Sequence, residues 1–482
     1  MTVRKRSVVA ALAIGVLAVT SACAEGNQGA PATSSGSSNG ASSAPVAAYK
    51  PAVITLGTAE DSKGPAIPPE GVVKGGTVTM IDRDDFSHLD PAQIYVNTEA
   101  NFGRLIARGL TGYKRVAKGE FKLVGDLATD PGTPSDGGKT WKFTLKDGVK
   151  WQDGTPITSA DVKWSMERTF APFVTQGPTY IQQWLTDVDF KKAYPGPYDG
   201  KELDAIETPD DKTIIYKFKS PHADANYAFA MAGYAIVPKA KDTKEQYDKE
   251  PVSSGPYIIK SHVVDKTMDL ERNPHWDPAT DPIRGAYPDK WHLEFGFEAL
   301  QVTDRLMADS GADQTAFTFY ASTPPERLQQ VLGDANLASR RMNSPSPYGN
   351  YYYFNLDRVK DIKIRQAINY AWPSKQIQQV MGGPAAAALP VIFGPIAEGA
   401  PNYSHLKDPA LTAEMDKITA MTDINAANAA WMALDKKVQE TITPLVVAEN
   451  RIATMLHGSK VGGAEIDPQQ WIVQPDTIFV KP

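Results

Sequence analysis

Residues 140–170 read TWKFTLKDGVKWQDGTPITSADVKWSMERTF, and this stretch carries the clearest structural pattern in the chain. The segment WKFTL at 141–145 alternates large apolar with polar residues, which predicts a strand with one apolar face. Two Asp-Gly pairs follow and predict turns. Thr158 with Asp161 three residues later is a helix-start signal, and it predicts a helix that continues to about Phe170. The stretch therefore indicates a fold that mixes strands and helices.

Elements of both kinds recur along the rest of the chain. Alternating or apolar runs predict further strands at 76–81, 213–218, 255–260 and 268–272. Helical spacing of apolar residues predicts helices at 100–110, 158–170, 362–372 and 425–441. No fixed repeat is present, so a solenoid or propeller is not expected. We expect an α/β (mixed α+β) body over residues 75–482, built from several subdomains.

Composition excludes several classes of protein. The chain has 482 residues, of which 42% are hydrophobic and 22% charged, an ordinary globular composition with length for about three domains. A net charge of -6 provides no basic field for nucleic acid, and we expect no nucleic-acid partner. The single cysteine excludes an intrachain disulfide and a structural cysteine-based zinc site.

The N-terminus has the pattern of an export signal. Basic residues precede an apolar run over 8–19, which is shorter than the ~20 residues that a membrane-spanning helix needs. The tetrapeptide TSAC ending at Cys23 resembles the lipobox of bacterial lipoproteins, whose cysteine receives a lipid. We expect a signal peptide over 1–22, lipidation of Cys23, and a flexible tether over 23–74 that begins almost without apolar bulk. A plain secretory signal with an incidental cysteine is the alternative.

Several motifs, taken together and in order, resemble the bacterial extracellular solute-binding proteins of family 5, the oligopeptide, dipeptide and nickel receptors of ABC importers. The most specific of them is the segment 143–162. The others include LDP at 89–91, NFGRLIARGL at 101–110, SGPY at 254–257, LERNPHW at 270–276, YYYFN at 351–355 and IRQAINYA at 364–371.

The resemblance implies a two-lobed, periplasmic-binding-protein-like fold with an extra subdomain in lobe I. A solute would be captured between the lobes by hinge closure, which favours the closed state when ligand is bound. The expected divisions are 75–110, 219–300 and 459–482 for lobe I, 111–218 for the extra subdomain, and 301–458 for lobe II.

The resemblance also suggests residues that contact the ligand. They are Tyr95, Asn97, Tyr180, Phe319, Tyr320, Tyr348 and Tyr351. Each aromatic residue among them could instead be an ordinary core or surface residue. We expect no catalytic, cofactor or metal site, because the chain has no Gly-x-Ser-x-Gly or His-Glu-x-x-His motif, and its Gly-Lys-Thr at 138–140 lacks the glycine that a phosphate loop requires at Thr133.

One departure from the family concerns the C-terminal lobe. The chain lacks a substantial block that the family normally has just before Asp408. In peptide receptors of this kind, an aspartate in that block pairs with the N-terminal ammonium of the ligand. The resemblance therefore implies a shortened C-terminal lobe and a ligand that depends little on a free N-terminus.

These observations favour a lipid-anchored receptor on the extracytoplasmic face of the cell membrane. It would capture a peptide-like solute as a monomer and deliver it to the permease subunits of an ABC importer. Two alternatives are an exported hydrolase with two carboxylates, and a signalling or degenerate receptor without a role in transport.

Overall fold

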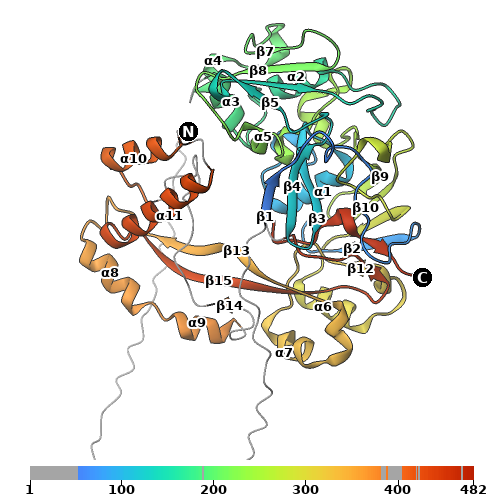
Figure 1. The fold of residues 1–482 in the computed structure, drawn as a ribbon. Helices are drawn as coiled ribbons and strands as arrows, with labels where there is room; N and C mark the ends of the chain where they lie inside the picture. The colour runs from blue at the N-terminus through green and yellow to red at the C-terminus, as the bar shows by residue number, and fades with distance from the viewer. Residues whose placement is uncertain are drawn as a thin grey trace, which may run out of the picture. The chain divides into compact units, whose positions relative to one another are not determined.

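A computed structural model of the protein describes residues 53–186, 189–381, 387–388, 404–419, 421, 424–467 and 470–482 (Figure 1). The predicted signal peptide, Cys23 and the first part of the predicted tether lie outside the described residues. Among the described residues, no helix has the length and apolar character needed to cross a membrane.

A five-stranded sheet forms the core of the body. Its order is β12-β2-β11-β10-β9, in which β2 pairs in parallel with β11 and β12 while the other pairs are antiparallel. Helix α1 (Asn97–Ile106) packs its apolar residues Phe102 and Leu105 into the same core. The strands are β2 (Thr77–Ile81), β9 (Tyr257–Val263), β10 (Thr267–Arg272), β11 (Lys290–Glu294) and β12 (Ala316–Phe317).

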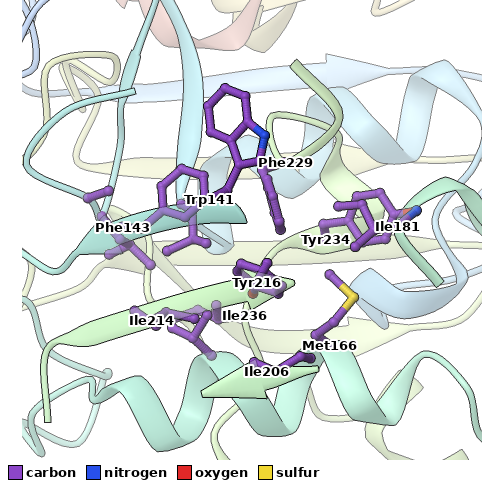
Figure 2. Close-up of a cluster of buried hydrophobic side chains, with 14 of the residues drawn as sticks. Trp141, Phe143, Met166, Ile181, Ile206, Ile214, Tyr216, Phe229, Tyr234 and Ile236 are labelled. Carbon is purple, nitrogen blue, oxygen red and sulfur yellow. The ribbon is translucent and has the colours of Figure 1, made fainter. Parts of the chain in front are cut away.

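A four-stranded sheet and helix α2 (Ser159–Arg168) contain the segment 140–170 and lie within the predicted extra subdomain. Figure 2 shows its core, in which Trp141 and Phe143 meet Tyr216 and Phe229. The predicted capping box is confirmed. The side chain of Thr158 accepts a hydrogen bond from the backbone N–H of Asp161, and the side chain of Asp161 accepts one from the backbone N–H of Thr158. The sheet order is β5-β6-β8-β7, with β5 (Thr133–Ser135), β6 (Thr140–Thr144), β7 (Ile206–Glu207) and β8 (Thr213–Lys217).

A third sheet changes the interpretation of residues 53–74. Strand β1 (Val53–Leu56) pairs in parallel with β4 (Glu120–Gly125), which in turn pairs with β3 (Thr111–Ala117). The following residues are also packed: Ser62 is fully buried, and its Oγ accepts a hydrogen bond from the backbone N–H of Gly125 at 2.9 Å. The expectation of a tether over 23–74 is therefore wrong from residue 53 onward, because this part of the chain completes a sheet.

Residues 299–340 pack onto the central sheet. Apolar residues of α6 (Ala299–Ala308) and α7 (Pro325–Gly333) share a buried cluster with Ile81 at the end of β2, and β12 is hydrogen-bonded to that strand. The sequence-based division placed this segment in lobe II. The lobe division stays a prediction, and this packing favours a boundary near Arg341.

Strands β13 (Arg341–Tyr353) and β15 (Leu445–Leu456) form a long antiparallel ladder (Figure 1). Its register runs from Arg341 opposite Leu456 to Tyr353 opposite Leu445, so the chain enters and leaves the intervening segment at neighbouring positions. Beyond this ladder, α10 (Pro409–Thr419) and α11 (Ile424–Thr441) build a separate small core that contains Ile418, Leu434 and Val438.

The remaining elements are short or lie in the segment beyond the ladder. They are α3 (Tyr180–Leu185), α4 (Phe190–Ala193), α5 (Ala225–Ala228), α8 (Ile362–Ala371), α9 (Ser374–Val380), β14 (Ala387–Ala388), β16 (Val461–Gly462) and β17 (Phe479–Val480). The predicted helices near 362–372 and 425–441 are thus confirmed.

Candidate functional site

A cavity of about 380 Å³ lies against α1. Its walls come from α1 and the loop before it, from β3, from the chain between Phe229 and Ala235, and from Ile283, Arg284 and Gln470. Segments from the N-terminal, middle and C-terminal parts of the chain therefore meet here. The volume falls within the range of about 300–1,000 Å³ that small-molecule sites occupy.

One face of α1 supplies much of the wall. The lining positions on this helix are 97, 100, 101, 103 and 104, with Ala107 directly after its last residue, and residues three or four apart in a helix lie on the same side. Three of these residues, Ala100, Gly103 and Ala107, are small. The helix backbone therefore lies close to the cavity at these positions. Arg104 is the charged residue that the helix contributes to the wall.

Two of the predicted ligand-contacting residues line this cavity. Tyr95 is 55% exposed and Asn97 begins α1. The side-chain amide of Asn97 donates a hydrogen bond from Nδ2 to the carbonyl of Gln470 at 2.8 Å. This bond ties the start of α1 to the C-terminal part of the chain, so the cavity wall is held from both sides.

The charge of Arg104 is balanced by two buried aspartates. Its Nη1 lies 3.5 Å from Oδ2 of Asp467, and its Nη2 pairs with Oδ2 of Asp476. Burial raises the pKa of Asp476, although Arg104 acts in the opposite direction. Arg104 thus lines the cavity with its positive charge compensated by these carboxylates.

A second arginine of the cavity wall, Arg284, is held in place by ion pairs and by a hydrogen bond to α1. Arg284 contacts Asp126 through Nη2 at 2.9 Å and Asp281 through Nη1 at 3.1 Å, and its Nε donates to the carbonyl of Arg104 at 2.7 Å. Burial alone would raise the pKa of Asp281, but Arg284 and Arg108 hold that pKa well below its usual range. This network is buried and its charges are paired, which indicates a structural role.

Tyr113 and Asn101 add uncharged polar groups to the wall. Burial raises the pKa of the Tyr113 hydroxyl, which therefore stays protonated at neutral pH. Asn101 is 1% exposed and donates from Nδ2 to the carbonyl of Val473 at 3.1 Å. Its Oδ1 has no hydrogen-bond partner in the structure.

Phe319 and Tyr320 lie outside this cavity. Phe319 is a correction: it is 1% exposed in the central core, with its ring edge-on to Phe317 at 5.4 Å, so no surface is left for a ligand. The hydroxyl of Tyr320 donates to Oδ2 of Asp84 at 3.0 Å, which fastens it beside the end of β2.

Tyr180 and Tyr351 are likewise not part of the cavity wall. Tyr180 begins α3, where its ring centroid lies 6.5 Å from that of Trp184. Tyr351 lies on β13, with its ring centroid 6.3 Å from that of Tyr353. The side chain of Tyr348 falls outside the described residues. Their contact with a ligand stays a prediction.

Sequence reasoning missed several members of the site. They are Ala100, Gly103, Arg104, Tyr113 and Gln470. The small residues at 100, 103 and 107 were a usable signal, because their spacing places them on one helix face. The described residues contain no group of three acidic, histidine or cysteine side chains able to hold a metal ion.

Comparison with known proteins decides the family. The sequence model for "Bacterial extracellular solute-binding proteins, family 5 Middle" matches residues 122–451. The chain belongs to this family. Members of this family are non-enzymatic receptors of transporters, which argues against an exported hydrolase.

Family 5 relatives with curated names share about a quarter of their residues with this chain. The probable D,D-dipeptide-binding periplasmic protein of Escherichia coli is 26% identical over 405 residues, which cover 79% of this chain and 71% of the relative. The periplasmic oligopeptide-binding protein of Salmonella typhimurium is 26% identical over 66% of this chain, and the match covers 57% of that relative. This family 5 chain therefore spans little more than half the length of some relatives.

Solved structures confirm the periplasmic-binding-protein fold of this family 5 protein. The clavulanic acid biosynthesis oligopeptide binding protein 2 superposes with a TM-score of 0.75 at 23% identity, covering 88% of this chain and 100% of that chain. The Escherichia coli murein tripeptide binding protein MppA gives a TM-score of 0.65 at 17% identity, with coverages of 85% and 99%.

Proposed function

We propose that this protein is the peptide-binding receptor of an ABC importer, held outside the membrane by a lipid on Cys23. The observation that carries the proposal is the cavity against α1, lined by Tyr95 and Asn97, in a chain that belongs to family 5. The names of its relatives point to peptide ligands for those proteins, which supports the same ligand class here.

The chemistry of the cavity suits a peptide. Apolar residues such as Phe229, Met231 and Ile283 provide contact area, while Arg104 and Tyr113 offer hydrogen bonds without a strong net charge. Peptide main chain carries both donors and acceptors, so such a wall can satisfy it without demanding a particular side chain. The receptor would therefore accept several sequences.

Binding is tested by calorimetry and thermal unfolding with alanine peptides of two to six residues. A ligand that binds only the folded state raises the melting temperature as its concentration rises. Tyr95→Ala should weaken binding, because Tyr95 lines the cavity and its ring is exposed to a ligand. Tyr320→Phe is the matched control, since its hydroxyl contacts Asp84 outside the cavity. Failure of every peptide to bind the wild-type protein would refute the proposal.

The anchor is tested separately by fractionating cells that express the full chain. Cys23→Ala removes the proposed acylation site. Without the lipid, the mature protein would lose the group that we propose attaches it to the membrane. The variant should leave the membrane fraction or remain unprocessed. If it stays membrane-bound like the wild type, the lipid anchor on Cys23 is wrong and peptide binding is unaffected.

A further inference from the structure

Gly103 occupies a position where a glycine has a cost for the protein. It lies inside α1 (Asn97–Ile106), and its backbone is helical, so the position does not require glycine for its conformation. Glycine in a helix interior is less favourable than alanine, because it loses more backbone freedom on folding. A reason for a glycine here must come from what lies beside it.

The packing of the protein does not supply that reason. A Cβ built at Gly103 would have as its nearest heavy atom the Cδ1 of Ile94 at 3.6 Å, an ordinary van der Waals contact. Two other glycines of the same cavity differ: a Cβ at Gly112 would lie 2.6 Å from Ile283 Cδ1, and one at Gly233 would lie 2.2 Å from Pro178 Cδ. A side chain at Gly233 would clash with the proline ring, and one at Gly112 would displace the tip of Ile283, whereas at Gly103 the protein leaves room for one.

A second observation on the same helix points to a missing partner. The Nδ2 bond from Asn101 to the carbonyl of Val473 fixes the orientation of the amide, and this leaves Oδ1 as an acceptor without a donor. Asn101 is 1% exposed and lines the cavity. A buried acceptor without a partner destabilises a protein, and a ligand N–H would remove that deficit.

We infer that the face of α1 that carries Ala100 and Gly103, with Ala107 just past the end of the helix, receives the main chain of a bound peptide, with an N–H of the peptide donating to Asn101. Gly103 sets the distance of closest approach, so that the peptide backbone lies against the helix. This inference rests on the proposed function, since it assigns part of the peptide's contact surface.

The first test compares two glycine-to-alanine substitutions within helices. Gly103→Ala adds a methyl group toward the cavity, and Gly333→Ala adds one at the end of α7, where no heavy atom lies within 4 Å. Both variants are measured by thermal unfolding without ligand and by calorimetry with the tightest-binding alanine peptide of two to six residues. We expect both melting temperatures to equal or exceed that of the wild type, with Kd raised tenfold or more only in Gly103→Ala.

Every outcome of this test decides the matter. A Gly103→Ala variant whose Kd for the peptide rises less than tenfold overturns the inference but leaves peptide binding intact. A lower melting temperature for Gly103→Ala would show that the space belongs to the protein's own packing, which also overturns it. If no peptide binds the wild type, the proposed function fails together with this inference.

The second test concerns the N–H bond to Asn101. Methylation of one peptide nitrogen at a time removes each N–H in turn, and one position should weaken binding to the wild type at least fivefold. That penalty should vanish in Asn101→Leu and persist in Asn226→Leu, because Asn226 also has an unpartnered Oδ1 but does not line the cavity. An undiminished penalty in Asn101→Leu would remove Asn101 from the contact surface.

Discussion

Replacement of Arg168 by leucine should destabilise the fold by about 3–5 kcal/mol, because it leaves buried carboxylates without a counter-charge. Arg168, the last residue of α2, is completely buried. Its Nη1 and Nη2 each donate to a carboxylate oxygen of Asp90 at 2.7 Å, and its Nε donates to Asp242 at 3.0 Å. Three charge-assisted bonds are each worth ~1.5–3 kcal/mol, and the cost of burying the guanidinium offsets part of that sum.

The effect of Arg168→Leu should depend on pH in a defined direction. Burial raises the pKa of Asp90 even in the presence of Arg168. Without the arginine, the folded state would hold a proton on Asp90 more strongly than the unfolded state does. The stabilisation that comes from protonation of Asp90 is present at low pH and is lost as pH rises. The difference in free energy of unfolding between the wild type and Arg168→Leu should therefore be smaller at pH 5 than at pH 8.

Urea unfolding followed by tryptophan fluorescence measures both quantities. Arg168→Lys should fall between the wild type and Arg168→Leu, since a lysine cannot donate to both oxygens of Asp90 in the fork geometry. Arg83→Leu is the control, because Arg83 pairs with Asp84 at the surface and its loss should leave the unfolding midpoint unchanged. A loss below about 1 kcal/mol for Arg168→Leu, or a deficit that grows toward pH 5, would show that Arg168 is not the counter-charge on which these carboxylates depend.

Three further predictions concern the rest of the chain. Burial raises the pKa of Asp82 to about 7, so the folded state binds a proton that the unfolded state releases at lower pH. The free energy of unfolding should therefore fall as pH rises from about 4 through 7. Asp82→Asn should abolish this decline, as measured by urea titrations at a series of fixed pH values. Trp141→Ala should cost about 3–5 kcal/mol, because the ring is 2% exposed within the core of the four-stranded sheet; a loss under 1 kcal/mol would contradict that packing. Calorimetry should show N-acetylated and free alanine peptides binding within about tenfold, or 1.4 kcal/mol, whereas a hundredfold preference for free peptides would reveal a carboxylate that pairs with the ammonium.

Local patterns allowed the sequence to predict some elements well. The strand at 141–145, the turns after it and helix α2 were predictable, because alternation, Asp-Gly pairs and a capping box act over a few residues. Strand β1 was not, since its four residues are flanked by proline and glycine and acquire their structure only by pairing with β4.

The site was only partly predictable for the same reason. Tyr95 and Asn97 follow a motif that is contiguous in sequence, whereas Asn101 meets Val473 across 372 residues and Phe319 bonds through its backbone to Asp82 across 237 residues. A pattern of nearby residues contains no information about such partners. Phe319 was therefore misjudged as a ligand contact, although its aromatic character fits the core equally well.

The pairing of Tyr353 with Leu445 makes residues 354–444 an exchangeable insert. Because the two ends of this segment meet across one rung of a ladder, parts of it other than β14, which pairs with β15, can change in length without moving either strand. Loop-closure entropy responds weakly to such changes, at about 0.6 kcal/mol for each doubling of length. A lineage could therefore lose or gain whole blocks here while the five-stranded sheet and the cavity against α1 stay as they are, and an engineer could graft a relative's segment between the same two residues.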